Sequence, residues 1–405
     1  MERANSNSNQ APLTSGGAGG GFFDELVERR GTGCVKWDEC PCDEVIPLWV
    51  ADMDFKAAPA IQKAILKRAE HGVFAYTFVD DDYYSAVINW FRRRHNWTIR
   101  REEILYTTGV VPAMSVAIKA LTMPSEKVLI LSPDYNCFFS SVRNNGCEVL
   151  ECGLKRVNDT FEVDFIDFEA KCADEKTTVF LLCNPHNPSG RVWTHEELER
   201  MNNICLKYGV KVVSDEIHCE LVMPGYQFQP FAAVSEACRQ NSVILNSPSK
   251  SFNIAGLQTA NIICSRPDWR RRLDRAININ EVCDLNPFGP VALKAAYNES
   301  EDWIDELNQY IWGNYQVLCD FIGKNIPQWK VCRLEGTYLP WVDISAMGMK
   351  SEELCEHLLR EAKVWINPGT MYGPTTGEGY VRFNIATQRS RLMEALERIA
   401  KVIKQ

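Results

Sequence analysis

Apolar segments of strand length alternate with segments of helical spacing through the middle of this 405-residue chain. Strands that are buried on both faces of a sheet are nearly continuous apolar runs, and helices cover the faces of such a sheet. The pattern therefore predicts an α/β fold in which a mostly parallel sheet lies between helices. The predicted strands are 104–107, 128–131, 148–150, 178–182, 210–213, 243–245 and 262–263.

Local signals mark the starts of several helices around these strands. Pro112 suits the first turn of a helix predicted over 112–121, because its fixed backbone angle fits that position. Thr194 and Glu197 form a capping box that opens another helix. A further helix with one apolar face is expected after Pro59. These signals support the alternation of strands and helices.

The pattern changes after Pro290. A long helix is predicted over 291–322, and a last helix is expected to begin at Ser390. Between them lie strand-like segments at 329–332, 338–344, 364–366 and 380–385. A chain of this length usually forms more than one core. We predict a disordered leader (1–21), an N-terminal segment that packs with the small domain (22–60), a large domain (61–290) and a small α+β domain (291–405).

Composition and charge exclude some classes of partner. Hydrophobic residues make up 45% of the chain and charged residues 24%, as in an ordinary globular protein. The formal net charge of −9 argues against a nucleic-acid or anionic-membrane partner, since both attract basic surfaces. No apolar run approaches the roughly 20 residues that a membrane span needs. We therefore expect neither a nucleic-acid nor a membrane partner.

The 16 cysteines show no metal-binding spacing. None forms C-x-x-C, and the six histidines form neither H-x-H nor H-x-x-x-H, so a zinc site is not expected. Cys40 and Cys42 are the closest pair, for which a plain loop is favoured over a redox role. Without a secretory signal, the simplest interpretation is free thiols in a reducing cytoplasm.

One lysine follows a predicted strand in a loop rich in serine and asparagine. Lys250 lies in the segment 246–253, directly after the strand 243–245. In helix-flanked parallel sheets, ligands bind beyond the carboxyl ends of the strands. A lysine held there can form a Schiff base with a carbonyl cofactor. Judged alone, a solvated loop lysine is the simpler interpretation, because short motifs are weak.

Three further polar features fall at the ends of other predicted strands. Gly109 precedes a helix whose N-terminus could hold a phosphate, and Asn187 lies in a loop shaped by prolines and a glycine. Asp215 follows the strand 210–213. Each alone could be only a turn or a cap. Together with Lys250 they describe a site for pyridoxal phosphate, in which the aspartate pairs with the ring nitrogen.

Six motifs make a family resemblance specific: WVADMDF at 49–55, GVVPA at 109–113, NPHNPSG at 184–190, DEIH at 215–218, SPSKSFN at 247–253 and VRFN at 381–384. With these motifs the chain resembles the fold-type I pyridoxal phosphate enzymes of the aspartate aminotransferase class. Within that class it is most similar to the MalY/PatB-type cystathionine β-lyases and cysteine–sulfur lyases. The resemblance extends from about residue 22 to the C-terminus and implies the aspartate aminotransferase-like fold.

The resemblance implies roles for four residues around the cofactor ring. Lys250 would form the Schiff base and then act as the general acid and base that moves the α-proton. Asp215 would keep the ring nitrogen protonated. Asn187 would donate to the ring 3-oxygen and border the substrate, and Tyr135 would stack on the ring. Judged alone, Tyr135 would be a packing tyrosine.

The resemblance also implies how phosphate and substrate are held. Gly109, Val110 and Ser247 would hold the phosphate. Tyr76 would reach the phosphate of a neighbouring subunit, which implies a homodimer with its active sites at the interface. Arg382 would clamp the substrate carboxylate with its planar fork. Judged alone, Tyr76 would be a packing tyrosine and Arg382 a surface arginine.

Two positions depart from the aminotransferase pattern. His218 stands where those enzymes usually have a tyrosine, as in the lyase branch, and we assign it to cofactor binding. Gln258 stands where they often have a phosphate-binding arginine, so other groups would have to hold the phosphate.

The activity implied by the resemblance is an α,β-elimination. A cytoplasmic enzyme would cleave cystathionine or a related cysteine S-conjugate to a thiol, pyruvate and ammonia. An aminotransferase on the same fold is the alternative, because the two reactions diverge only after the α-proton is removed. A regulatory protein that binds the cofactor without turnover is a third interpretation, since fold does not fix function.

Overall fold

The computed structural model describes residues 21–404 of the chain. The predicted disordered leader lies outside the described residues, apart from Gly21. Among the helices of residues 21–404, none combines the length and apolar character needed to cross a membrane.

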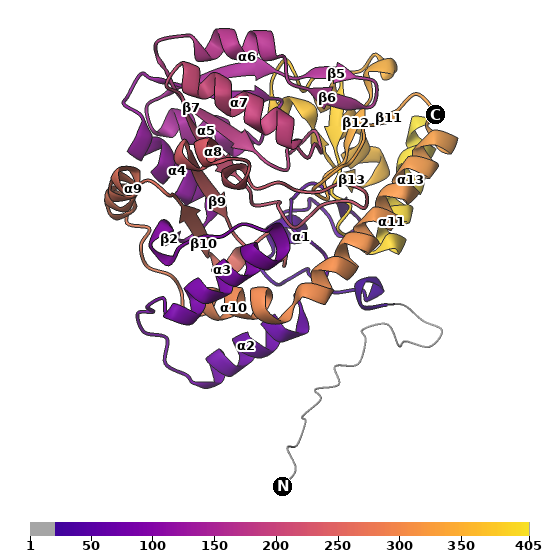
Figure 1. The fold of residues 1–405 in the computed structure, drawn as a ribbon. Helices are drawn as coiled ribbons and strands as arrows, with labels where there is room; N and C mark the ends of the chain where they lie inside the picture. Colours follow the sequence, from indigo (N-terminus) through magenta and orange to yellow (C-terminus); the bar gives the residue numbers. More distant parts are fainter. Residues whose placement is uncertain (1–20, 405) are drawn as a thin grey trace.

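A seven-stranded sheet forms the centre of the larger part, with the strand order β2-β10-β9-β8-β7-β3-β4 (Figure 1). Its strands are β2 (Ile104–Thr107), β3 (Lys127–Ser132), β4 (Glu148–Gly153), β7 (Thr177–Cys183), β8 (Lys211–Asp215), β9 (Ser242–Asn246) and β10 (Ala260–Ile263). All neighbours pair in parallel except β10, which runs antiparallel to both β9 and β2. The predicted mostly parallel sheet is therefore confirmed.

The reversal of β10 has a local cause. The loop between β9 and β10 contains a single 3-10 turn, Ala255–Leu257, and no α-helix that could carry the chain back across the sheet. A parallel connection needs such a crossover, so β10 returns antiparallel to β9. Because β2 is antiparallel to β10, β2 again runs in the same direction as β9, and its carboxyl end reaches the same edge of the sheet.

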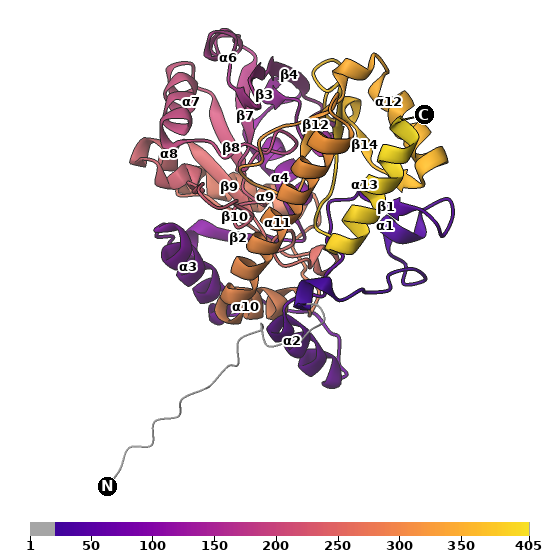
Figure 2. The same cartoon turned by 90° about the vertical axis from the view of Figure 1, so that its right-hand side faces the viewer.

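Helices cover both faces of this sheet (Figures 1 and 2). Alternate strand residues point to opposite faces. Val128 and Ile130 of β3 accordingly join a core with α4 (Val110–Leu121), α5 (Asn136–Asn144) and α9 (Pro267–Ile279). Leu129 and Leu131 join the other core with α6 (Phe165–Cys172) and α7 (His195–Lys207). The sheet is thus buried on both faces, as its continuous apolar strands predict.

The C-terminal part contains a second, antiparallel sheet with the order β11-β12-β15-β14. Its strands are β11 (Lys330–Val331), β12 (Trp341–Asp343), β14 (Asn367–Pro368) and β15 (Tyr380–Arg382). The long helix α11 (Glu301–Asn325) packs against the last helix, α13 (Arg389–Ile403). Near the N-terminus, β1 (Ile46–Pro47) pairs in parallel with β13 (Val364–Trp365). This pairing joins the N-terminal segment to the C-terminal part.

The remaining strands and α-helices of the described chain are α1 (Val35–Asp38), α2 (Pro59–Glu70), α3 (Asp81–His95), β5 (Lys155–Val157), β6 (Thr160–Glu162), α8 (Glu236–Gln240), α10 (Gly289–Glu299) and α12 (Ser351–His357).

The structure corrects two predicted elements of the C-terminal part. The helix predicted over 291–322 is two helices, α10 and α11, because Ser300 leaves the helical conformation between them. Its hydroxyl donates to the Ala295 carbonyl, which competes with helix continuation. The strand predicted over 338–344 is limited to β12; before it, the Tyr338 and Pro340 carbonyls accept from the backbone of Ile385 and Phe383, but Pro340 has no N–H to continue a ladder.

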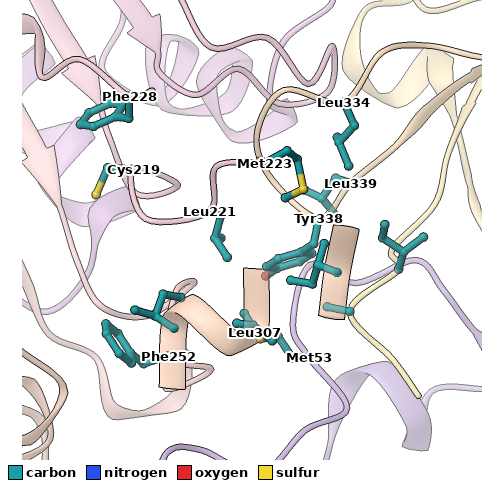
Figure 3. Close-up of a cluster of buried hydrophobic side chains, with 14 of the residues drawn as sticks. Met53, Cys219, Leu221, Met223, Phe228, Phe252, Leu307, Leu334, Tyr338 and Leu339 are labelled. Carbon is teal, nitrogen blue, oxygen red and sulfur yellow. The ribbon is translucent and has the colours of Figure 1, made fainter. Parts of the chain in front are cut away.

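A single hydrophobic core joins the larger and the C-terminal parts (Figure 3). In it, Tyr338 and Leu339 from the loop before β12 lie among side chains from the loop after β8, from α11 and from the N-terminal segment. These are Leu221 and Met223, Leu307, and Met53. The packing fixes the position of residues 338–339 relative to the carboxyl edge of the central sheet.

Candidate active site

A cavity of about 190 Å³ lies at the carboxyl edge of the central sheet. Seven of the residues predicted for the site line it: Gly109, Val110, Tyr135, Asn187, Asp215, His218 and Lys250. They are spread along the chain from residue 109 to residue 250, and the parallel strands bring them to one edge. Ala51 and Ser249 also line the cavity, although sequence reasoning did not select them.

Lys250 is partly buried, and within residues 21–404 it forms no salt bridge with a carboxylate. Its Nζ donates to the backbone carbonyl of Ala51 at 2.6 Å. Burial lowers the pKa of the Lys250 amine, because the charged form is poorly solvated there, and the nearby Arg382 adds to this effect. A lysine with a lowered pKa is suited to nucleophilic attack and to proton abstraction.

Asp215 ends β8 and lies deep in the cavity. Burial raises the pKa of its carboxyl to about 7, since the charged form loses its hydration. Among the described residues, the only hydrogen-bond donor to its side-chain carboxyl is the backbone N–H of Ile217, at 3.1 Å. A buried acid of this kind is stabilised as the anion when a cationic nitrogen binds beside it.

Arg382 ends β15 and is a buried cation without a carboxylate partner among the described residues. Its side chain is held only by neutral groups: the Asn187 Oδ1 accepts from one Nη at 3.1 Å, and the Trp49 carbonyl accepts from the other at 2.8 Å. The guanidinium also lies over the Tyr372 ring, 4.6 Å from its centroid. Its Nε is buried without a partner. This burial agrees with the expectation that Arg382 is not a surface arginine. An anionic group bound beside the guanidinium would supply the charged partner that a buried cation needs.

The phosphate end of the predicted site lies at a helix N-terminus. Gly109 is the N-cap of α4 and Val110 is its first residue, so backbone N–H groups and the positive end of the helix face the cavity. Ser247 does not line the cavity. Its hydroxyl is hydrogen bonded to the Thr259 carbonyl (2.6 Å) and to the Ser249 hydroxyl (2.7 Å). Ser249, to which it is bonded, lines the cavity.

His218 presents a neutral imidazole to the cavity. Burial lowers the pKa of its ring to about 3, and the cations of Lys250 and Arg382 act in the same direction. The Nδ1 atom is buried without a partner, and the ring meets the Tyr338 ring edge-on, with 6.2 Å between centroids. His218 is therefore free to hydrogen bond a group in the cavity.

Tyr76 is the one predicted site residue that is fully exposed. It is 96% exposed, does not line the cavity of its own chain, and belongs to a segment without regular structure. Three large apolar neighbours, Val73, Phe74 and Phe78, are also exposed. Contiguous exposed apolar side chains of this kind are uncommon on monomeric proteins.

The residues present fit pyridoxal phosphate. A lysine with a lowered pKa, a buried aspartate short of donors and a helix N-terminus match the aldehyde, the ring nitrogen and the phosphate of that group. The buried Nδ1 of His218 supplies one more polar contact.

Comparisons with known proteins cover nearly the whole chain. The sequence profile of the family described as "Aminotransferase class I and II" matches residues 43–399. The chain is 40% identical over 381 residues to cystathionine beta-lyase PatB of Bacillus subtilis (strain 168), which covers 93% of this chain and 98% of that protein. It is 32% identical over 390 residues to protein MalY of Escherichia coli (strain K12), covering 94% and 98%. The crystal structure of cystalysin from Treponema denticola, which contains a pyridoxal 5'-phosphate cofactor, matches with a TM-score of 0.91 and 34% identity, covering 94% and 98%.

Proposed function

Because the chain belongs to the aminotransferase class I and II family, we propose that it is a pyridoxal phosphate-dependent carbon–sulfur β-lyase. Its substrates are cystathionine or related cysteine S-conjugates, and its products are a thiol, pyruvate and ammonia. The observation that carries the proposal is a cavity lined by a base, Lys250, and a buried acid, Asp215, with a guanidinium close by. The guanidinium is that of Arg382, which does not line the cavity itself but donates to Asn187, which does. Elimination rather than transamination is supported by the similarity to cystathionine beta-lyase PatB.

When bound, pyridoxal phosphate supplies an electron sink that stabilises the negative charge left after the α-proton of an amino acid is removed. Asp215 would pair with the ring nitrogen as an ionised carboxylate and keep that nitrogen protonated. Arg382 binds the substrate carboxylate through its fork and orients the α-carbon. Lys250 would take the α-proton at Nζ, and its lowered pKa favours the neutral amine that this step requires.

The proposal predicts pyruvate and a free thiol from cystathionine without any added keto acid. A transaminase would need a keto acid to continue beyond one turnover per site. The measurement is pyruvate and thiol release over a panel of cysteine S-conjugates, with and without a keto acid. Turnover that depends on the keto acid would contradict the lyase.

Replacing Arg382 by lysine is expected to raise KM about 10–100-fold while kcat changes little. A lysine keeps the charge but loses the planar fork, and one charged hydrogen bond contributes about 1.5–3 kcal/mol. The clamp holds the substrate equally before and during reaction, so its loss appears in KM. Steady-state kinetics check this, with Arg333→Lys as the control, because Arg333 pairs with Asp159 at the surface. An unchanged KM would contradict the assigned clamp.

We also propose a homodimer in which Tyr76 of each chain completes the site of the other. The exposed segment around Tyr76 supports this, since a second copy would cover its apolar side chains. Mixing refolded Tyr76→Ala and Lys250→Ala chains is expected to restore about a quarter of the wild-type activity, because half of the dimers are mixed and each has one intact site. The parent proteins, refolded separately, are the controls. A mixture no more active than its parents would contradict the proposal.

A further inference from the structure

Residues 49–52 pass the cavity, which Ala51 lines, and all four of their backbone carbonyls accept hydrogen bonds from side chains. The carbonyl of Trp49 accepts from Arg382, and the carbonyl of Ala51 accepts from Lys250. The carbonyls of Val50 and Asp52 both accept from the side-chain amide of Asn384. One short segment thus contacts both the proposed substrate clamp and the proposed base.

The Ala51 carbonyl has a second donor besides Lys250. The hydroxyl of Tyr338 donates to it at 2.9 Å, and the Lys250 Nζ donates at 2.6 Å. Tyr338 is completely buried, and the core that joins the two parts of the protein fixes its ring (Figure 3). Because the ring cannot move away, the hydroxyl holds the Ala51 carbonyl in one orientation and occupies part of its hydrogen-bonding capacity.

We propose that Tyr338 is a positioning residue for Lys250, acting through the Ala51 carbonyl on which the free lysine amine rests. The proposal rests on the proposed function, because it concerns the base of the same reaction. An oxygen that accepts from one donor binds that donor more strongly than an oxygen shared by two. Sharing by Tyr338 therefore weakens the hold of Ala51 on the protonated amine, so that Lys250 is released more readily as a base.

The charged and titratable groups that act on Lys250 come from several elements: Asp52, Cys137, Asp215, His218 and Arg382. Tyr338→Phe leaves all of them in place and removes only the shared hydrogen bond. Its expected effect is therefore specific to the Ala51 contact. The matched control is Tyr315→Phe, because that half-buried hydroxyl also donates to a backbone carbonyl, that of Cys332 at 3.0 Å, and does not line the cavity.

The first test uses the full chain freed of cofactor and does not depend on activity. Trace acetylation with acetic anhydride across a pH series reports the deprotonated fraction of Lys250, read from its peptide by mass spectrometry. Tyr338→Phe is expected to raise the pKa of Lys250 by about one unit, as expected for one net hydrogen bond, and Tyr315→Phe to leave it unchanged. Coincident titration curves for Tyr338→Phe and the wild type would overturn the proposal, as would equal shifts in both variants.

The second test uses the loaded enzyme. Tyr338→Phe is expected to lower kcat at pH 7 about tenfold and to move the acid limb of its pH profile upward, with KM within about twofold. KM rising in step with the loss of kcat would overturn the proposal, because Arg382 rests on a different carbonyl. If the wild-type chain shows no lyase activity, the proposed function fails, and the acetylation series still decides the role of Tyr338.

Discussion

Replacing Lys250 by alanine is expected to reduce carbon–sulfur bond cleavage by at least about 10⁴-fold, because a general base alone contributes about 10²–10⁴-fold and the covalent attachment is lost as well. The visible absorbance of the lysine-bound cofactor should disappear in the same variant. Steady-state rates with cystathionine and the absorbance spectrum measure the two effects.

Lys211 offers a matched control for this substitution. It begins β8 at the opposite end from Asp215, and burial lowers the pKa of its amine too. Lys211→Ala should therefore keep both the activity and the absorbance. If Lys250→Ala retained wild-type activity, the assignment of the base would be wrong.

Replacing Asp215 by asparagine is expected to lower kcat about 10²–10³-fold. Removing one partner of a buried ion pair costs about 3–5 kcal/mol, and here the partner left alone is the ring nitrogen. The nitrogen then loses its proton, and the electron sink weakens.

Rates with saturating substrate check this prediction, with Glu216→Gln as the control. Glu216 is an equally buried acid whose pKa is raised to about 8, but its carboxylate accepts from Phe231 N–H and the Ser214 hydroxyl. Equal losses in the two variants would contradict the specific role of Asp215.

The pKa of Asp215 also predicts a pH dependence of stability in the cofactor-free chain. Burial raises its pKa to about 7, whereas an unfolded chain has a value near 3.9. Between these values the folded state holds a proton that the unfolded state has released. The contribution of Asp215 to the free energy of unfolding is therefore fully present below about pH 4, and it is lost as the pH rises toward 7. The urea concentration at the unfolding midpoint should therefore decline across that pH range in the wild-type chain, and it should decline less in the Asp215→Asn variant.

The sequence was sufficient to predict the sheet and most of the cavity, because both follow from strand direction. Parallel strands place their carboxyl ends at one edge, so Asp215 and Lys250 had to lie near each other once their strands were recognised. The helix α3 was missed, although Asp80 caps it and Tyr83, Val87 and Trp90 follow at helical spacing. The break at Ser300 was missed because serine alone does not interrupt a strong helical pattern.

The residues that sequence reasoning did not find act through the backbone. Ala51 contributes a carbonyl, which has no side-chain signal, and Tyr338 reaches it from 287 positions further along the chain. Ser249 was not selected either, because only the turn after β9 shows that it lines the cavity while the Ser247 hydroxyl bonds Thr259. Contacts of this kind depend on tertiary packing that periodicity does not describe.

The most direct test of the lyase assignment is the stoichiometry of many turnovers on cystathionine with no keto acid present. We expect pyruvate, ammonia and homocysteine thiol in equal amounts, each exceeding the amount of enzyme sites by at least about 10²-fold. Release of keto acid that stops at one equivalent per site, and resumes only when a keto acid is added, would contradict the lyase and show a transaminase.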